Sequence, residues 1–341
     1  MKITALIDPG VAPRRDPQML APWDSAQEPP MDRSVIQALR SNGHEVTVVS
    51  FEGDVLAALD RARPELVFNM TEFVDGNRRR SGDVPALLEA LGLRYTGAGA
   101  IGQVLTIDKA VSKMVVRDLG VAVPGFEVLP IGRTRLRRAL AFPVLVKPRY
   151  GEGSEGITLR SLAATPADVA RLVRLVHDAL GQAAICEEFI DGRELAVGIL
   201  GDRELTAFPV RETAYGTWRT GRARFNTSLL KTSAAFRTRF GICSVKADLP
   251  RAAARAVQAD CIRIFRALEL RDYGRIDLRQ DASDRVVFIE ANANCDLKPS
   301  AFGVIAAWGG ITYSQLIETI VQQARRRRAD RVPLHQSRPL F

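Results

Sequence analysis

The sequence predicts an α/β protein that begins with an open, mostly parallel sheet and continues into two further units. In the first hundred residues, short apolar strand signals alternate with short helix signals, which is typical of a parallel sheet with helices on both faces. A glycine-rich loop beside an apolar strand marks a second unit, and two apolar strands with acidic side chains mark a third. At 341 residues the chain exceeds one ordinary hydrophobic core.

The composition indicates a globular protein without a membrane span. Hydrophobic residues make up 46% of the chain and charged residues 26%, and no stretch approaches the roughly 20 apolar residues that a membrane helix needs. The N-terminal residues resemble a first strand rather than a signal peptide, so we expect a cytoplasmic location and no membrane partner. Four dispersed cysteines and three dispersed histidines indicate neither a zinc site nor a disulfide framework. We expect Cys186 and Cys261 to be buried thiols.

The basic charge balance has two explanations. The formal net charge is +9, and residues 325–328 are all Arg. RNA binding is therefore an alternative, but the Arg residues are spread along the chain and no nucleic-acid motif accompanies them, so anionic small molecules are predicted instead. Only seven of the 48 basic residues are Lys, which singles out Lys109, Lys147 and Lys231 as sites that need a compact ammonium group.

The first unit has a regular order of elements. Strands are predicted at residues 3–7, 45–50 and 66–70, and helices at residues 33–40, 55–61 and 83–91. Ligands of open parallel sheets bind beyond the carboxyl ends of the strands. Those ends carry Asp8 to Gly10 and Asn69 to Glu72.

Two further units follow. A helix is predicted at residues 108–119, then a linker at residues 121–124. Next come strands at 143–147 and 156–160, a helix that begins with the cap Thr165 and Pro166, and a strand at 184–190. The third unit has strands at 195–200 and 205–210, a long polar segment at 211–245, a helix after Pro250, a strand pair and a last helix at 313–324.

The strand pair near the C-terminus carries candidate metal ligands. Asp277 lies in the first strand, and Glu290 and Asn292 lie in the second. Side chains alternate along a strand, so Glu290 and Asn292 point the same way. Oxygen ligands favour Mg²⁺ or Mn²⁺, and Mg²⁺ usually binds together with nucleotide phosphates. The alternative is a polar-faced hairpin, whose ends often carry Asp and Asn.

A glycine-rich loop follows Lys147. Gly151, Gly153 and Gly156 would let the backbone approach phosphate oxygens, as in anion-binding nests. The loop joins two predicted strands, so it is neither a Walker loop nor a dinucleotide motif, both of which need a helix behind the glycines. A flexible hairpin is the alternative.

A second candidate nucleotide segment runs from Glu187 to Glu194. It places two carboxylates on either side of a turn that follows a strand, where they could bind an adenine amino group and ribose hydroxyls. A charged hairpin rim is the alternative.

These signals occur once each and in a fixed order, and in that order the sequence resembles the ATP-grasp superfamily. The resemblance is strongest to its D-alanine–D-alanine ligase-like branch and covers about residues 1–325. The matching stretches are residues 93–99, 107–109, 146–156 and 187–194, Lys231, and residues 274–292.

The resemblance implies a site for ATP and Mg²⁺, with Mn²⁺ as a substitute, between two antiparallel sheets. Metal ligands would be Asp277, Glu290 and Asn292. ATP contacts would be Lys109, Lys147, Gly153, Ser154, Glu187, Glu188, Ile190, Glu194 and Lys231. In this set Glu187 would face the adenine amino group, Glu188 and Ile190 would meet the ring edge through their backbone, and Glu194 would bind the ribose. Arg275, Lys231 and Ser154 would act in catalysis.

The resemblance also implies a domain layout and a reaction. Residues 1–105 would form an N-terminal domain, 106–190 a central ATP-grasp subdomain, 191–328 a C-terminal ATP-grasp subdomain, and 329–341 a tail. The enzyme, suggested to be a homodimer, would join a small carboxylate to an amine through an acyl phosphate. Because an acyl phosphate hydrolyses readily, residues 151–156 and 211–245 are candidate lids.

Departures from the family pattern bear on the substrate. D-alanine ligases carry a Glu in the first loop, paired serines in the glycine-rich loop and a Tyr after the phosphate Lys. Here the corresponding residues are Asp8 to Gly10, Gly153-Ser154 and Thr232, and residues 294–297 replace a Pro-Gly turn. Glu72 and Ser300 are candidate substrate contacts. Alternatives are a biosynthetic ligase with an acceptor that is no amino acid, and a nucleotide-binding protein without turnover.

Overall fold

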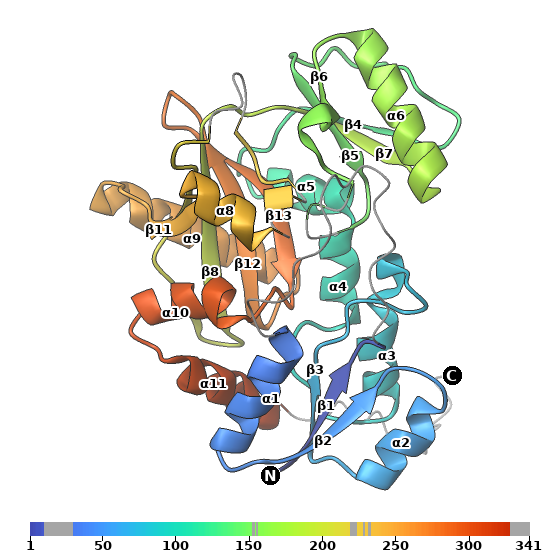
Figure 1. Cartoon of the computed structure of the whole chain (residues 1–341), viewed down its shortest axis with the longest axis vertical. Helices are drawn as coiled ribbons and strands as arrows, with labels where there is room; N and C mark the ends of the chain where they lie inside the picture. The colour runs from blue at the N-terminus through green and yellow to red at the C-terminus, as the bar shows by residue number, and fades with distance from the viewer. Residues whose placement is uncertain are drawn as a thin grey trace, which may run out of the picture.

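The computed structural model describes residues 1–9, 30–151, 154, 156–218, 224–227, 229–230 and 233–327. The first unit contains the predicted parallel sheet, with β1 (Lys2–Ile7) paired to both β2 (Glu45–Ser50) and β3 (Leu66–Asn69). Its helices are α1 (Met31–Ser41), α2 (Val55–Ala62) and α3 (Asp83–Ala90), with the short helix η1 (Arg78–Arg80) before α3 (Figure 1). The α/β prediction for this unit is confirmed.

Two helices, α4 (Ala100–Ile107) and α5 (Lys109–Asp118), connect the first unit to the rest of the molecule (Figure 1). Asp108 is extended and accepts hydrogen bonds from the backbone N–H groups of Ala110 and Val111, so the chain bends there and α5 begins. The predicted helix therefore exists, but it is preceded by a second helix that the sequence analysis did not include.

The second unit is a four-stranded antiparallel sheet in the order β4 (Phe126–Leu129), β7 (Ala184–Glu188), β5 (Val144–Pro148), β6 (Leu162–Ala163). Helix α6 (Pro166–Leu180) packs on it and begins with the predicted Thr165 cap. The strand predicted at residues 156–160 is wrong. Thr158 instead caps the short helix η2 (Leu159–Ser161). Its hydroxyl accepts from the backbone N–H of Arg160, and the Ser161 hydroxyl accepts from the backbone N–H of Thr158. These local hydrogen bonds compete with strand pairing.

The third unit is an antiparallel sheet in the order β11, β10, β8, β12, β13, with β9 paired to β8. These strands are β8 (Arg193–Gly201), β9 (Leu205–Ala207), β10 (Arg211–Ala214), β11 (Cys243–Lys246), β12 (Asp272–Gln280) and β13 (Val286–Ala293). The segment at 211–245, which the sequence indicated only as polar, thus contains two strands and helix α8 (Ala234–Phe240). The prediction of two antiparallel sheets is confirmed.

Helix α9 (Arg251–Ala267) covers one face of this sheet. Val257, Cys261 and Phe265 pack against the apolar side chains of β8, β12 and β13. Cys186 and Cys261 are free, fully buried thiols, as expected. Because side chains alternate along each strand, the opposite face of the sheet carries the polar residues.

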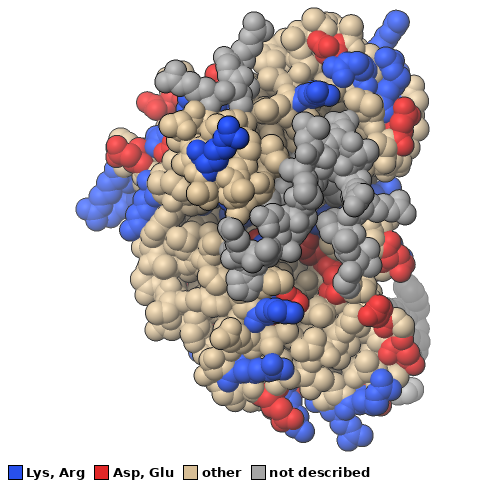
Figure 2. All heavy atoms as spheres, in the orientation of Figure 1, with Lys and Arg blue, Asp and Glu red and all other residues tan. Residues whose placement is uncertain are grey.

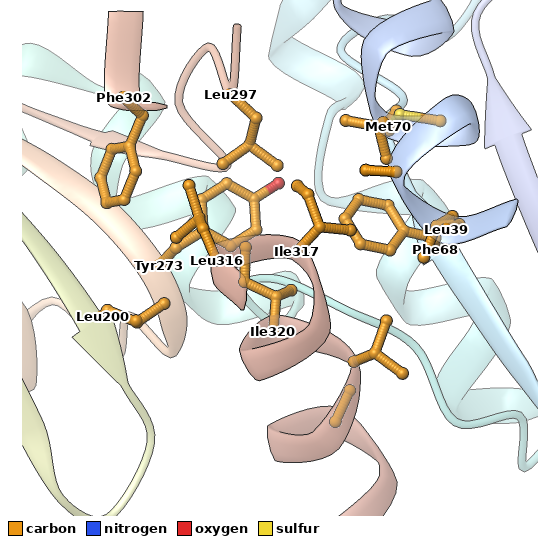
Figure 3. Packing of buried hydrophobic residues seen from close by; sticks show 14 of the residues in the cluster. Leu39, Phe68, Met70, Leu200, Tyr273, Leu297, Phe302, Leu316, Ile317 and Ile320 are labelled. Atoms are coloured by element: carbon orange, nitrogen blue, oxygen red, sulfur yellow. The ribbon is translucent and has the colours of Figure 1, made fainter. Parts of the chain in front are cut away.

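The C-terminal helices return to the first sheet. They are η3 (Pro299–Gly303), α10 (Val304–Trp308) and α11 (Tyr313–Arg326). In one continuous core, Leu316, Ile317 and Ile320 of α11 lie between Phe68 of β3 and Tyr273 of β12 (Figure 3). Among the described residues no single helix is long and apolar enough to cross a membrane. The segments 299–308 and 313–326 pass that test only as a pair bent by 89°.

We predict that Ile320→Ala lowers the free energy of unfolding by about 2–5 kcal/mol, because it removes a buried side chain between two sheets. Ile101 on α4 is a matched control, since it is 66% exposed whereas Ile320 is fully buried. Ile101→Ala should change the free energy of unfolding by no more than about 0.5 kcal/mol. Urea unfolding of both variants checks the difference, and similar losses would contradict the role of α11.

Candidate ATP and metal site

A buried group of three charges lies at the centre of the predicted ATP site. Glu187, at the end of β7, pairs with Lys113 (Nζ to Oε1, 2.8 Å) and with Lys147 (Nζ to Oε2, 2.9 Å). All three side chains are almost completely buried. Burial alone would raise the pKa of Glu187, but the two ammonium charges hold that pKa below its ordinary value. The structure therefore brings together two of the predicted ATP contacts, Lys147 and Glu187, and adds Lys113.

Lys113 also joins the two antiparallel sheets. Its ammonium group donates to the carbonyl of Ile289 at 2.6 Å, and Ile289 is the residue at which β12 and β13 change register. The next residue is the predicted metal ligand Glu290. Burial lowers the pKa of Lys113 to about 8, against the opposing charge of Glu187. The scarcity of Lys in the sequence applies to Lys113 as well, so that signal could have singled it out.

The predicted metal ligands share the polar face of the third sheet. Asp277 lies directly opposite Glu290, and Arg275 opposite Asn292, so all four side chains project from the same face. The amide nitrogen of Asn292 donates to Asp277 Oδ2 at 3.0 Å. Within the described residues no three His, Cys, Asp or Glu side chains form a metal cluster. The predicted trio has two carboxylates and one amide, which suits a hard cation.

Arg275 neutralises Asp277 in this structure. Its guanidinium donates two hydrogen bonds to the carboxylate, from Nε to Oδ1 at 2.6 Å and from Nη2 to Oδ2 at 2.8 Å. Burial would lower the pKa of Arg275, but the charge of Asp277 raises it above the ordinary value. In the next strands, Arg211 of β10 lies in register with Ala196 of β8, which is paired with Asp277. Arg211 is therefore a second cation on this face, which the sequence analysis missed because Arg is so common in the chain.

The segment after β7 is fastened to the third sheet by Arg279. Its guanidinium donates to the carbonyls of Ile190 (2.5 Å) and Gly192 (2.9 Å) and lies 5.0 Å from the ring centre of Phe189. Glu194 accepts from the hydroxyl of Tyr215 at 2.5 Å and lies 3.4 Å from Arg279. Hydrogen bonds and an ion pair thus hold the segment that carries the predicted adenine and ribose contacts. Arg279 is a further positioning residue, which the sequence analysis did not identify.

The glycine-rich loop contacts both neighbouring units. Lys109 is buried, and its ammonium group donates to the carbonyl of Gly151. The hydroxyl of Ser154 lies 3.5 Å from the carbonyl of Asn226, whose backbone N–H donates to Glu194 at 3.1 Å. Gly153 and Lys231 lie outside the described residues. Glu188 accepts from the backbone N–H groups of Gly125 and Ala141.

Glu72 lies at the carboxyl end of β3, where the parallel sheet meets the end of β13. It forms an ion pair with Arg78 at 2.6 Å. Asp8 accepts from the backbone N–H groups of Glu72 (2.8 Å) and Phe73 (3.2 Å), so it fastens this loop to the end of β1. Burial raises the pKa of Asp8 to about 6. The other candidate substrate contact, Ser300, lies exposed on η3.

Charged side chains are dispersed on the face drawn in Figure 2. Lys and Arg residues stand singly or in small groups, with acidic residues between them. This face offers no continuous basic surface among the described residues.

Comparison with known proteins identifies the family. A model described as "D-ala D-ala ligase C-terminus" matches residues 115–322. A D-alanine–D-alanine ligase from Bordetella petrii is 31% identical over 86% of each chain, and one from Gluconobacter oxydans is 28% identical over 85% of this chain and 92% of its own. An uncharacterized protein, y4sG, from Sinorhizobium fredii is 33% identical over 91% of both chains.

The fold comparison agrees. A crystal structure of a D-alanine–D-alanine ligase from Bacillus anthracis, described as complexed with ATP, superposes with a TM-score of 0.73 at 18% identity, covering 96% of this chain and 98% of its own. The chain belongs to the D-alanine–D-alanine ligase family of ATP-grasp proteins. The resemblance and the fold class inferred from the sequence are confirmed.

We predict that Glu187→Ala lowers the free energy of unfolding by about 3–5 kcal/mol, because it leaves two buried ammonium groups without a counter-charge. Glu188→Ala is the matched control in the same strand. It removes two backbone hydrogen bonds from a partly exposed side chain and should cost about 1–2 kcal/mol. Denaturant unfolding compares the two variants, and equal losses would argue against the buried ion group.

Asp8 gives a prediction of pH dependence. Its pKa of about 6 lies above the ordinary value of 3.8, so the folded protein binds this proton more tightly than the unfolded chain does. Its stabilising contribution is therefore present below pH 4 and is lost as the pH rises to 6. The difference in unfolding free energy between the wild type and Asp8→Asn should change by about 3 kcal/mol over that interval. A difference that does not change with pH would show that burial does not raise the pKa of Asp8.

Proposed function

We propose that the protein is an ATP- and Mg²⁺-dependent carboxylate–amine ligase that forms an amide or peptide bond through an acyl phosphate. The observation that carries the proposal is the shared face of β12 and β13, where Arg275, Asp277, Glu290 and Asn292 stand together. Lys113 links that face to the buried pair of Lys147 and Glu187. Membership of a ligase family supports this assignment.

The residues present fit the predicted cation. Asp277 and Glu290 face each other across the strand pair, and a guanidinium already binds Asp277 through both oxygens, so this position favours positive charge. Bound Mg²⁺ would supply neutralisation of the phosphate charge and alignment of the phosphate oxygens. Asp277, Glu290 and Asn292 would hold it. Arg275 would then be released to lie beside the transferred phosphoryl group.

The chemistry needs no protein nucleophile. A carboxylate oxygen of the substrate attacks the γ-phosphorus of ATP, and the bond from that phosphorus to the ADP oxygen breaks. The amine then attacks the carbonyl carbon of the acyl phosphate, the carbon–oxygen bond to phosphate breaks, and the nitrogen loses a proton. Lys109, Lys147 and Lys231 would hold the phosphates together with Gly153 and Ser154, and residues 187–194 would hold the nucleoside.

The substrates are amino acids or small carboxylates with an amine. The relatives named D-alanine–D-alanine ligases support this class. The altered residues at positions 8–10, 232 and 294–297 set this chain apart from the pattern of those ligases, so we do not assign D-alanine. An acceptor that is no amino acid is compatible with the same chemistry, and the homodimer stays a prediction.

ADP release tests the proposal. With ATP and Mg²⁺, a screen of amino acids and small carboxylates, singly and in pairs, should find a combination that drives ADP and phosphate formation. Asp277→Asn and Glu290→Gln should each lower this rate by about 100-fold or more, because each removes a negative charge that holds the cation. Asp284→Asn is the matched control in the turn of the same hairpin and should retain the rate. Turnover that survives both site variants would exclude this metal assignment, and nucleotide binding without turnover would exclude the ligase.

A further inference from the structure

A small pocket lies beside the proposed site, between the loop after β3, the start of α3, helix α4 and the end of β13. Its lining includes Glu72, Arg78, Ser81, Gln103 and Asn294. Asn294 is two residues beyond the predicted metal ligand Asn292, so the pocket adjoins the face on which the reaction would occur. The pocket has room for only a water-sized group.

Two hydrogen-bonding groups at this pocket have no partner in the described part of the chain. They are the hydroxyl of Ser81 and the side-chain nitrogen of Asn294, and both atoms are buried. Ser81 is only 7% exposed. Buried polar groups in folded proteins are nearly always hydrogen-bonded to protein or to ordered water, so two such groups at one pocket mark a position for a water molecule or for a ligand group of the same size.

The orientation of Asn294 is fixed by the first unit. Its side-chain oxygen accepts from the backbone N–H of Ala98 at 2.8 Å, which leaves the nitrogen as the group that can donate. Asn294 has a φ of +46°, and a Cβ at Gly97 would lie 2.2 Å from the Asn294 oxygen. A strained backbone and an obligatory glycine thus hold the amide where it is, as is common at binding sites.

The lining of the pocket does not favour a charged ligand. Glu72 and Arg78 neutralise each other in an ion pair, and the Arg78 guanidinium is stacked on Phe73 at 4.0 Å from the ring centre. The remaining polar groups are the hydroxyls of Thr71 and Ser81 and two carboxamides, which bind neutral groups through hydrogen bonds. A small neutral group that both accepts and donates, such as a hydroxyl, matches this lining.

We propose that the pocket receives the side-chain hydroxyl of a serine-sized amino-acid substrate, so that the enzyme selects a β-hydroxy amino acid over alanine. This inference rests on the proposed ligase function. The hydroxyl would accept from the Asn294 nitrogen and bond to the Ser81 hydroxyl. The methyl group of alanine would leave both protein groups unpaired, and sites of this kind reject an analogue that lacks the hydroxyl.

The test compares serine with alanine, each as both enantiomers, as the varied substrate in the ADP-release assay. We expect kcat/KM for one serine enantiomer to exceed that for the matching alanine by about 100-fold or more. Ser81→Ala and Asn294→Gly should each bring this ratio down by at least about tenfold, mainly through KM for serine. Glycine suits the positive φ at position 294. Ser41→Ala, at the exposed end of α1, is the control and should keep the ratio.

A binding measurement separates this inference from the proposed function. Calorimetric titration of the protein with serine and with alanine, in the presence of Mg²⁺ and a nonhydrolysable ATP analogue, should show the same preference and its loss in both variants. If no compound drives ADP release, the ligase function is overturned. The titration alone then tests whether the pocket binds the serine hydroxyl. If serine and alanine bind equally, or if neither variant changes their ratio, the pocket holds only water and the inference is wrong.

Discussion

The arrangement of the candidate site depends on the burial of Glu187 between Lys113 and Lys147. Three charges removed from water are stable only when each is paired closely, so the helix and the two strands that carry them have little freedom to shift. Lys113 extends this constraint to the second antiparallel sheet through the carbonyl of Ile289. One ammonium group on α5 therefore connects the predicted nucleotide contact Glu187 to the strand that carries the predicted metal ligands Glu290 and Asn292.

The polar face of β12 and β13 balances its own charge. Arg275 and Arg211 lie among Asp277, Glu290 and Glu194, so positive side chains offset the repulsion between these carboxylates. The same balance means that a cation would compete with a guanidinium for Asp277. In the proposed mechanism, binding of a metal ion would therefore require Arg275 to leave the Asp277 carboxylate.

The sequence predicted what local patterns encode. The parallel strands of the first unit, the Thr165 cap, the hairpin and the shared face of Glu290 and Asn292 all follow from periodicity and capping residues. The strand predicted at residues 156–160 was wrong because the hydroxyl side chains of Thr158 and Ser161 favour a short helix. Lys113, Arg279 and Asn294 were missed because their importance comes from contacts with residues more than 80 positions away. Local spacing carries no record of such contacts.

The return of α11 to the first sheet has a consequence for the order of folding during synthesis. Phe68 and the strands around it emerge from the ribosome about 250 residues before the helix that covers them. N-terminal segments generally fold first as they emerge, but this sheet lacks one wall of its core until α11 is made. The nascent N-terminal segment must therefore wait, with its apolar surface available to chaperones, until α11 has been translated.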